Sequence, residues 1–389
     1  MKLFLKKISL FIILFLLVNF ALFYTLDSIR SNERIHKQKY TQIIKFSDKA
    51  TMSLVRKSYV ADPTDGNYYI LKPGLEQKNR EEVENLLHKS GLYNSVLDDW
   101  SPHKIWTGMA SEFYKFREIN KFRNVDVIFL GSSHAFLGFD PRIFQKHNIS
   151  SFNLGIRGQG PLNAYYLLKR YYHVLLPKIV IIECYFHSIV VDGYEAYLYT
   201  LVNHPLDLSV LEMGIAAGGP DAVKSFFIEA VKRLRYPLDR YPDIISKSYI
   251  PGGYGTTGKK NDREAKIDKR YNRKFTLSPL QLGYLEKTIR FCQENNSRVF
   301  MVTHPLPDVF LSQVINYDEM SWQIQEIARE HNVEYIDFNT IMQLDYYEDF
   351  KDLHHLNQSG VNKFNNKLIN ILLKFDSFKK ICQKASLNR

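Results

Sequence analysis

The stretch Val125–Leu130 (VDVIFL), which runs directly into Gly131-Ser132-Ser133-His134, decides the fold. A short apolar run that ends at a glycine is typical of a buried β-strand. Similar runs follow at Ile179–Cys184 (IVIIEC), Val299–Thr303 (VFMVT), Val333–Phe338 (VEYIDF) and, more briefly, Phe152–Leu154. Helix-like segments lie between them, notably Leu162–Tyr172, Pro279–Asn295 and Met320–His331. This alternation predicts an α/β domain, a three-layer sandwich whose central parallel sheet is covered by helices on both faces.

Ser133 lies where the first predicted strand ends. In open α/β sheets, ligands bind at the carboxyl ends of the parallel strands. Gly131 permits a sharp turn, and a helix expected after Gly138-Phe139-Asp140-Pro141 would direct backbone N–H groups toward a developing oxyanion. A serine in this position also commonly caps a helix, so this junction alone leaves a structural role open.

A second polar cluster lies near the other end of the chain. Asp352-Leu353-His354-His355-Leu356-Asn357 precedes an amphipathic helix that is expected from Gln358 to about Phe375. A serine needs an adjacent base to become a nucleophile, and an imidazole oriented by a carboxylate is such a base. Surface histidines beside a helix cap at Asn357 are the structural alternative. Adjacent His354 and His355 also suit zinc, but no H-E-x-x-H pattern or third ligand accompanies them, and no metal is predicted.

Together these motifs resemble the SGNH/GDSL hydrolases. Gly131-Ser132-Ser133-His134 is similar to their first block, and Asp352-x-x-His355 with the following Leu-Asn-x-x-Gly is similar to their last. Asn153–Gly160 (NLGIRGQG) resembles the second block. The resemblance implies a flavodoxin-like sheet, with Ser133 as nucleophile, His355 as base and Asp352 as the acid that orients it. It also implies an oxyanion hole formed by the backbone N–H groups of Ser133 and Gly155.

The sequence departs from the family pattern at two places. Ser132 stands where the first block commonly has Asp. The third block, G-x-N-D, is missing, and Ile182–Ser188 (IECYFHS) stands at that strand end. The family's oxyanion-hole asparagine therefore has no counterpart that the sequence identifies. Loss of one such donor typically lowers the rate by about 10²–10³-fold, so another group replaces it or turnover is slow.

Several further residues are candidates for contacts with substrate. They are Ser132, His134, Arg157, Gln159 and His304. His304 follows another predicted strand, and a structural loop histidine is the alternative there. Arg157 suits an anionic substrate, and an exposed loop arginine is its alternative. Cys184, Cys292 and Cys382 are too few and too scattered for a disulfide framework or a zinc site.

The N-terminus predicts a membrane anchor. Lys2, Lys6 and Lys7 precede Ile8–Thr25, which carries no charge over 18 residues, or about 27 Å of helix. A cleaved signal peptide is the alternative, but this stretch is long for one and lacks a small-residue cleavage site. The lysine cluster predicts a cytoplasmic N-terminus and a single span, with the main domain extracytoplasmic, in the periplasm or at the cell surface.

The expected organisation has three parts. Residues 1–26 form the anchor, 27–122 a helical stalk that includes a helix at Arg80–Leu87, and 123–389 the SGNH-like domain. An insertion at about 191–276 interrupts the α/β pattern. Between Val231 and Phe275 it holds 13 Lys/Arg against 5 acids, which accounts for most of the net charge of +11. It is either a solvated helical insertion with a mobile loop or a rim that attracts an anionic polymer or lipid headgroups.

An anchored, outward-facing domain of this kind is similar to proteins that modify bacterial envelope polymers. These include polysaccharide, peptidoglycan and alginate O-acetylation proteins and the lipoteichoic-acid D-alanylation protein. The resemblance implies an acyl-serine ester hydrolase or O-acyltransferase acting on a cell-surface glycan, with a polytopic membrane-bound acyltransferase as a possible partner. The alternative is a non-catalytic accessory protein that binds glycan or that partner. No cofactor is predicted, and without a phosphate-binding motif or a nucleic-acid motif neither nucleotide nor nucleic acid is expected.

Overall fold

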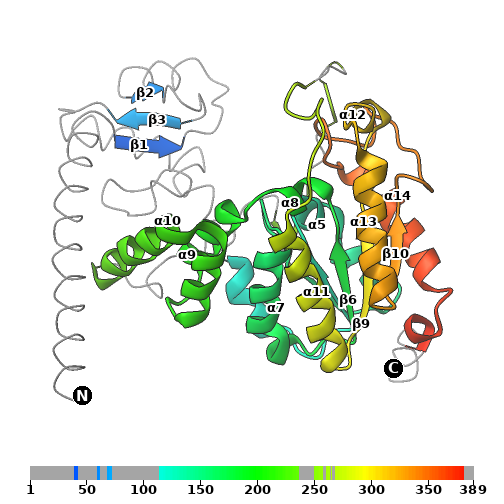
Figure 1. Ribbon diagram of the computed structural model, residues 1–389, viewed down its shortest axis with the longest axis horizontal. Helices are drawn as coiled ribbons and strands as arrows, with labels where there is room; N and C mark the ends of the chain where they lie inside the picture. The colour runs from blue at the N-terminus through cyan, green and yellow to red at the C-terminus, as the bar shows by residue number, and fades with distance from the viewer. Residues whose placement is uncertain are drawn as a thin grey trace, which may run out of the picture. The chain divides into compact units, whose positions relative to one another are not determined.

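The computed structural model describes residues 114–235, 249–256, 260–262, 264 and 268–380, together with three short strands nearer the N-terminus. The chain divides into two compact units, Met1–Gly108 and Met109–Arg389 (Figure 1), and each is considered by itself. The predicted anchor at 8–25 and the predicted helix at 80–87 lie outside the described residues. Within the described residues, no helix is both long enough and apolar enough to span a membrane.

The described part of the first unit is a small antiparallel sheet. Strands β1 (Lys39–Gln42), β2 (Tyr59–Ala61) and β3 (Tyr68–Leu71) pair in the order β1-β3-β2. The prediction for residues 27–122 was a helical stalk or N-terminal extension with some loop, and it did not include these three strands. Their sequences, KYTQ, YVA and YYIL, are rich in aromatic and β-branched residues, which favour extended backbone.

The second unit contains the predicted parallel sheet. Its strands are β4 (Val127–Leu130), β5 (Ser151–Asn153), β6 (Ile179–Glu183), β9 (Arg298–Thr303) and β10 (Glu334–Asp337). All neighbours are parallel, in the order β10-β9-β6-β4-β5. Counted along the chain this is 2-1-3-4-5, the flavodoxin-like order, so the α/β prediction is confirmed. The order reverses between β4 and β6, and the carboxyl ends of these two strands form the switch point where ligands bind in such sheets.

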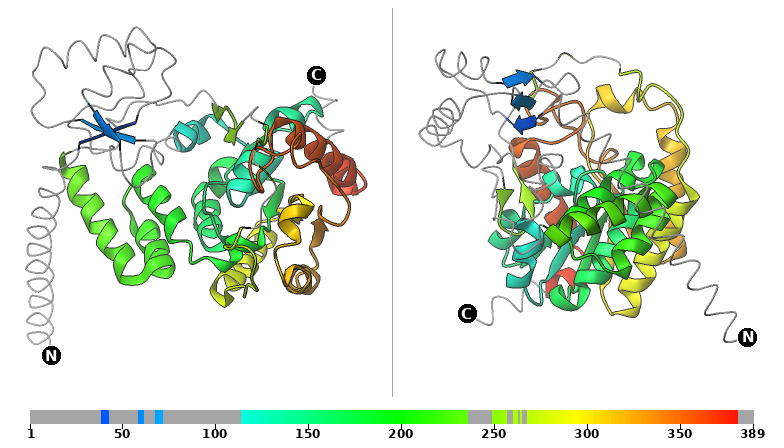
Figure 2. Two further views of the ribbon diagram at one scale, coloured as in Figure 1. Left: turned by 90° about the horizontal axis from the view of Figure 1, so that it is seen from above. Right: turned by 90° about the vertical axis from the view of Figure 1, so that its left-hand side faces the viewer.

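Helices cover the sheet on both sides (Figures 1 and 2). One face packs against α7 (Pro161–Leu175), α11 (Pro279–Glu294) and α13 (Tyr317–Glu330), through a core that includes Ile128, Val180 and Met301. The other face packs against α6 (Pro141–Lys146) and α14 (Gln358–Leu372), through Phe129, Ile181 and Phe300. Alternate residues of one strand thus enter opposite cores, which explains why the strands are apolar throughout.

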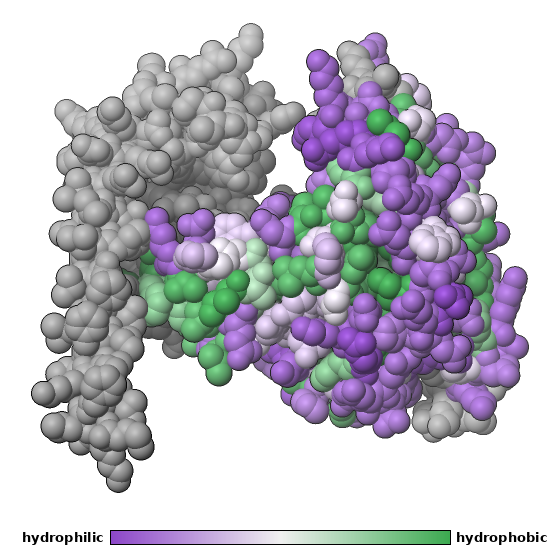
Figure 3. Space-filling model, in the orientation of Figure 1, coloured by the Kyte–Doolittle hydropathy of each residue, from purple (hydrophilic) through white to green (hydrophobic). Residues whose placement is uncertain are grey.

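The insertion adds a helical layer outside α7. After the short α8 (Phe186–Val190), helices α9 (Tyr194–Asn203) and α10 (Leu208–Arg235) form a hairpin, and Gly219-Pro220 kinks α10. Their own small core contains Tyr197, Val210 and Met213, together with Leu162 of α7. Figure 3 shows hydrophobic side chains over this hairpin and further hydrophobic side chains over the middle of the same face. Beyond α10, the two-residue strands β7 (Tyr249–Ile250) and β8 (Tyr254–Gly255) pair with each other.

Candidate active site

Ser133 is the first residue of a helix that begins immediately after strand β4. Helix α5 (Ser133–Gly138) starts two residues beyond Gly131, with Ser132 as its N-cap. The Ser132 Oγ accepts a hydrogen bond from the His134 N–H at 3.2 Å. The sequence analysis expected the helix only after Gly138-Phe139-Asp140-Pro141, where α6 begins instead with Asp140 as its cap. The nucleophile candidate therefore lies at a helix N-terminus, where backbone N–H groups are free of helical partners.

Asp352 and His355 lie on a loop that is fixed at both of its ends. Phe350 and Leu356 pair across the loop as an isolated β-bridge. Asn357 caps α14 by accepting hydrogen bonds from the N–H groups of Ser359 and Gly360, at 2.9 and 3.2 Å. Its amide nitrogen also donates to the Glu348 and Phe350 carbonyls. The loop therefore holds its histidine and carboxylate in a defined place, as the predicted cap at Asn357 requires.

The structure brings Ser133, His355 and Asp352 together in one hydrogen-bonded chain. Ser133 Oγ lies 2.8 Å from His355 Nε2, although the two residues are 222 positions apart. His355 Nδ1 lies 3.0 and 3.1 Å from the two carboxylate oxygens of Asp352. The tautomer with its hydrogen on Nδ1 satisfies both contacts, because it leaves Nε2 free to accept the serine proton. This is the arrangement that activates a serine nucleophile.

The carboxylate of Asp352 stays ionised in this setting. Burial alone would raise its pKa, but hydrogen bonds from the His355 ring and backbone and the charge of His355 outweigh burial and lower the pKa well below its usual range. The backbone N–H groups of His354 and His355 both donate to Oδ1, at 3.2 and 2.9 Å. An ionised, anchored carboxylate of this kind stabilises an imidazolium and fixes its orientation.

The predicted oxyanion hole is formed only in part. The Ser133 N–H has no hydrogen-bond partner among the described residues. The Gly155 N–H, however, donates to Asn153 Oδ1 at 2.9 Å, so here it is not the free donor that was predicted. The amide nitrogen of Asn153 donates to the Ala135 and Phe139 carbonyls, at 2.7 and 2.9 Å. These bonds fix the side chain so that its Oδ1 accepts the Gly155 N–H, which would otherwise be available to an oxyanion.

Gly155 nevertheless lies directly against the nucleophile helix. A Cβ atom on it would come within 2.7 Å of Ala135 Cβ and 2.8 Å of the Phe136 nitrogen. Only a glycine permits so close an approach of the two backbones.

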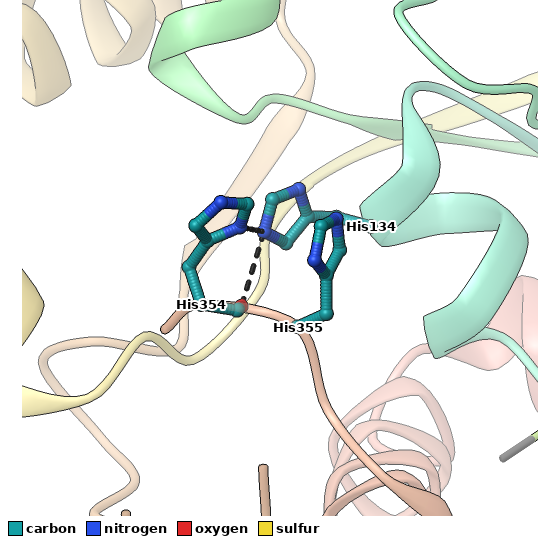
Figure 4. Close-up of side chains that lie close together, drawn as sticks. All are labelled: His134, His354 and His355. Carbon is teal, nitrogen blue, oxygen red and sulfur yellow. Dashed lines mark hydrogen bonds between the residues drawn. The ribbon is translucent and has the colours of Figure 1, made fainter. Parts of the chain in front are cut away.

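Three histidine rings meet beside the triad, and Figure 4 shows them stacked together. One ring nitrogen from each of His134, His354 and His355 lies within 4.8 Å of the others. His134 Nε2 is 3.1 Å from the His354 carbonyl oxygen and 3.2 Å from His354 Nδ1. Burial, followed by the neighbouring His355, lowers the pKa of His134 and takes that of His354 to about 3, so both rings are neutral. Neutral imidazoles can bind a metal, but a metal here would compete for His355 with Ser133 and Asp352.

Two predicted substrate contacts, Gln159 and His304, lie in the packed interior. Gln159 is fully buried, and its amide accepts from the Gly131 N–H at 2.9 Å and donates to the Leu154 carbonyl at 3.3 Å. His304 is also buried and packs on Phe139 and Phe364, and within the described part of the chain neither ring nitrogen has a partner. Neither side chain faces solvent, and the contact of either residue with substrate stays a prediction. Both follow strand ends, but their side chains turn into the packed interior.

The remaining candidates lie closer to the triad. The His134 ring stacks on His355, with 4.7 Å between centroids, but it is only 3% exposed and so supports the base rather than facing solvent. Ser132 is likewise buried. Arg157 is exposed, and its charge acts on Lys351, whose side chain lies 3.8 Å from Asp352. Arg157 is thus the candidate best placed to meet a substrate from outside.

The sequence analysis missed Glu183 as a residue of this site. Glu183 ends strand β6, is 4% exposed, and accepts hydrogen bonds from both the N–H and the Oγ–H of Ser132. An acid that closes a run of four buried apolar residues was the signal available in the sequence. The sequence did not identify Glu183, because the family pattern has an asparagine at this strand end and the missing asparagine is the more conspicuous difference.

Replacing Glu183 by glutamine is expected to remove a pH dependence of stability. Burial raises the pKa of Glu183 from 4.5 to about 7, against the hydrogen bonds from Ser132. The Glu183 carboxyl therefore binds its proton more tightly in the folded chain than in the unfolded chain. As the pH rises from the pKa of Glu183 in the unfolded chain to its pKa in the folded chain, the free energy of unfolding decreases.

The shift corresponds to about 3 kcal/mol. Urea unfolding should show that the stability of Glu183→Gln relative to the natural protein increases by up to about that amount between about pH 5 and about pH 8. The same pH dependence in both proteins would contradict an ionisation of Glu183 in this range.

Comparisons with known proteins add only distant likenesses. No family model matches the chain, and no curated protein matches it. Among solved structures, an acetyl xylan esterase, AlAXEase, is 14% identical over 64% of this chain and 100% of its own, with a TM-score of 0.34. A GDSL-like lipase from Bacteroides thetaiotaomicron is 11% identical over 67% of this chain and 98% of its own, with a TM-score of 0.34. A family two carbohydrate esterase from Clostridium thermocellum is 10% identical over 65% of this chain and 64% of its own, with a TM-score of 0.30. Structures with identities and TM-scores this low say nothing of the function of this chain. The function has to be inferred from the geometry of its own site.

Proposed function

We propose that this protein is a serine ester hydrolase or O-acyltransferase of the SGNH type. The observation that carries the proposal is the hydrogen-bonded chain from Ser133 Oγ through His355 to Asp352, at 2.8 and 3.0 Å. It stands at the carboxyl edge of a flavodoxin-like sheet, next to the switch point between β4 and β6. The partly buried carboxylate of Asp352, the His355 imidazole and the Ser133 hydroxyl are aligned in the order that activates a serine nucleophile.

The reaction follows from the roles of the three side chains. His355 Nε2 takes the proton of Ser133 Oγ as this oxygen attacks the carbonyl carbon of an ester. The negative charge that develops on the carbonyl oxygen is stabilised by the Ser133 N–H at the start of α5. His355 then returns its proton to the leaving alkoxide, which departs as an alcohol and leaves an acyl-serine. Water or a sugar hydroxyl, deprotonated by His355, attacks this acyl-serine and releases the serine.

A cell-surface glycan or another envelope polymer is the substrate that we propose. The support is the predicted anchor at residues 8–25, which would hold the domain outside the cytoplasm, together with the resemblance to envelope-modifying proteins. Exposed Arg157 suits an anionic group on such a polymer. A membrane-bound acyltransferase that delivers acyl groups across the membrane remains the predicted partner.

The test is covalent labelling by a fluorophosphonate probe, which reacts with activated serines. We expect the full chain to form a single adduct, located at Ser133 by peptide mass spectrometry, and Ser132→Ala to form it as well. A chromogenic acetyl ester then reports turnover, and glycan acceptors that raise turnover above that in water would distinguish transfer from hydrolysis. An unlabelled protein that still binds glycan would favour the non-catalytic accessory role.

A further inference from the structure

Glu183 is a buried acid at the end of strand β6, and it contacts Ser132, the N-cap of the helix that carries Ser133. Strand β6 lies beside β4 in the sheet, with Ile182 in register with Leu130. Glu183 is therefore opposite the turn at Gly131, one residue before the cap of α5. A glycine is required at that turn, because a Cβ on Gly131 would lie 2.5 Å from Glu183 Cβ and 2.6 Å from its Oε2. Gly131 also has a φ of +142°, which side-chain-bearing residues rarely adopt.

One carboxylate oxygen of Glu183 receives both hydrogens that Ser132 can donate. The Ser132 N–H and Oγ–H each lie 2.9 Å from Glu183 Oε2. Because a hydroxyl has one hydrogen, its donation to Glu183 leaves the lone pairs of Ser132 Oγ for the His134 N–H, which is the capping bond of α5. Glu183 thus sets both the backbone and the hydroxyl of the residue that starts the helix.

This arrangement costs free energy that packing alone does not explain. Glu183 Oε1 is buried and has no close hydrogen-bond partner within the described residues, and the Tyr185 N–H acts only weakly on the carboxylate. A buried polar atom without a full hydrogen bond is unfavourable, because it has lost its contacts with water and has gained nothing equivalent in their place. An apolar side chain would avoid that cost, but it would leave the Ser132 N–H without its acceptor at the point where α5 begins.

We propose that Glu183 is a positioning residue for catalysis, which holds Ser132 so that the Oγ and N–H of Ser133 face the ester carbonyl. The inference rests on the proposed function. Ser133 follows Ser132 directly, so any shift of the cap moves the attacking oxygen away from His355 and the N–H away from the oxyanion. Misplacement by about 1 Å can lower a rate by about 10²-fold. Ser132 stands at the position where the first block of the family commonly has an acid. Glu183 supplies an acid next to that position from the neighbouring strand β6.

The experiment compares the rate of fluorophosphonate labelling at Ser133, and kcat and KM for an acetyl ester, in the natural protein and four full-length variants. Glu183→Leu removes the acceptor, and Glu183→Gln keeps an oxygen in its place. Glu229→Leu is the matched control, because Glu229 is an equally buried acid that pairs with Arg233 on α10, away from the triad. Ser132→Ala keeps the backbone bond and removes the cap.

We expect Glu183→Leu to lower kcat and the labelling rate about 10²-fold with KM little changed. Glu183→Gln should stay within about five-fold of the natural protein, since its oxygen can still accept both hydrogens. Ser132→Ala should fall between them, and the folded fraction of Glu229→Leu should react at the natural rate. If Glu183→Leu does not fold, the labelling rate and kcat of Ser132→Ala test the proposal in its place.

Two different outcomes overturn the proposal. If Ser133 is labelled in the natural protein and Glu183→Leu or Ser132→Ala reacts at the natural rate, Glu183 has only a structural role and the proposed function stands. If Glu183→Gln loses as much as Glu183→Leu, hydrogen-bond acceptance is not what Glu183 supplies. No labelling of Ser133 in the natural protein overturns the function and the inference together.

Discussion

Replacing Ser133 by alanine should reduce ester hydrolysis by a factor of about 10⁵ or more, the range in which loss of a serine nucleophile falls. In the proposed reaction, the 2.8 Å contact between Ser133 Oγ and His355 Nε2 allows the serine to lose its proton and form an acyl-serine. Without the hydroxyl, only substrate binding and the helix N-terminus remain to accelerate attack by water. The measurement is kcat/KM for a chromogenic acetyl ester, taken with purified full-length protein.

The control for this experiment is Ser225→Ala. Ser225 lies on α10, where its hydroxyl contacts the hydroxyl of Tyr194, and it has no contact with the triad. This variant should keep natural turnover and an unchanged fluorophosphonate adduct. Hydrolysis that survives in Ser133→Ala at the natural level would overturn the assignment of Ser133 as the nucleophile.

Replacing Asp352 by asparagine should lower kcat by about 10⁴-fold while the fold is kept, as loss of the orienting carboxylate does in serine triads. Asp352 accepts the His355 Nδ1 hydrogen and two backbone N–H groups. An asparagine can turn its amide NH₂ toward Nδ1, which favours the tautomer with hydrogen on Nε2. That nitrogen then donates to Ser133 Oγ and cannot accept its proton. The loss of charge also removes stabilisation from the imidazolium.

A matched control lies on the same loop. Asp349 is buried, accepts from Ser359 Oγ at 2.8 Å and pairs with Lys363 at 2.7 Å, but does not touch the triad. Asp349→Asn should lower the melting temperature and leave kcat within a few-fold of its natural value. Equal losses of kcat in both variants would show that the loop's order, and not the carboxylate at Asp352, is what the reaction needs.

The sheet and the triad could be predicted from the sequence because each depends on short-range patterns and one general rule. Each β-branched apolar run became a strand, within one or two residues at its ends. Parallel strands place their carboxyl ends on one edge, so residues after different strands meet there. That rule brings Ser133 and the loop of Asp352 and His355 to one edge of the sheet, whereas their roles as nucleophile, acid and base came from the resemblance to the SGNH/GDSL hydrolases.

The details that the sequence did not predict depend on competition between hydrogen-bond partners. The Gly155 N–H is not free, because it donates to Asn153 Oδ1. The amide nitrogen of Asn153 donates to the Ala135 carbonyl on α5, which holds that oxygen in place. Gln159 and His304 turned inward because neighbouring backbone and aromatic rings offered them room there. Glu183 bonded to Ser132 through a contact 51 positions away. No local pattern decides such choices, because they depend on which groups the fold has already placed nearby.

The order of the two halves of the reactive pair along the chain has a consequence for biosynthesis. Ser133 is synthesised long before His355, and the loop that carries the histidine is held by the cap of the final helix of the sheet's outer layer, α14. During synthesis the hydroxyl of Ser133 therefore has no contact with His355 until α14 has been made and has packed onto the sheet. A chain that stopped before this helix would lack the fixed loop, and Ser133 would have no base beside it, even with all five strands of the sheet in place.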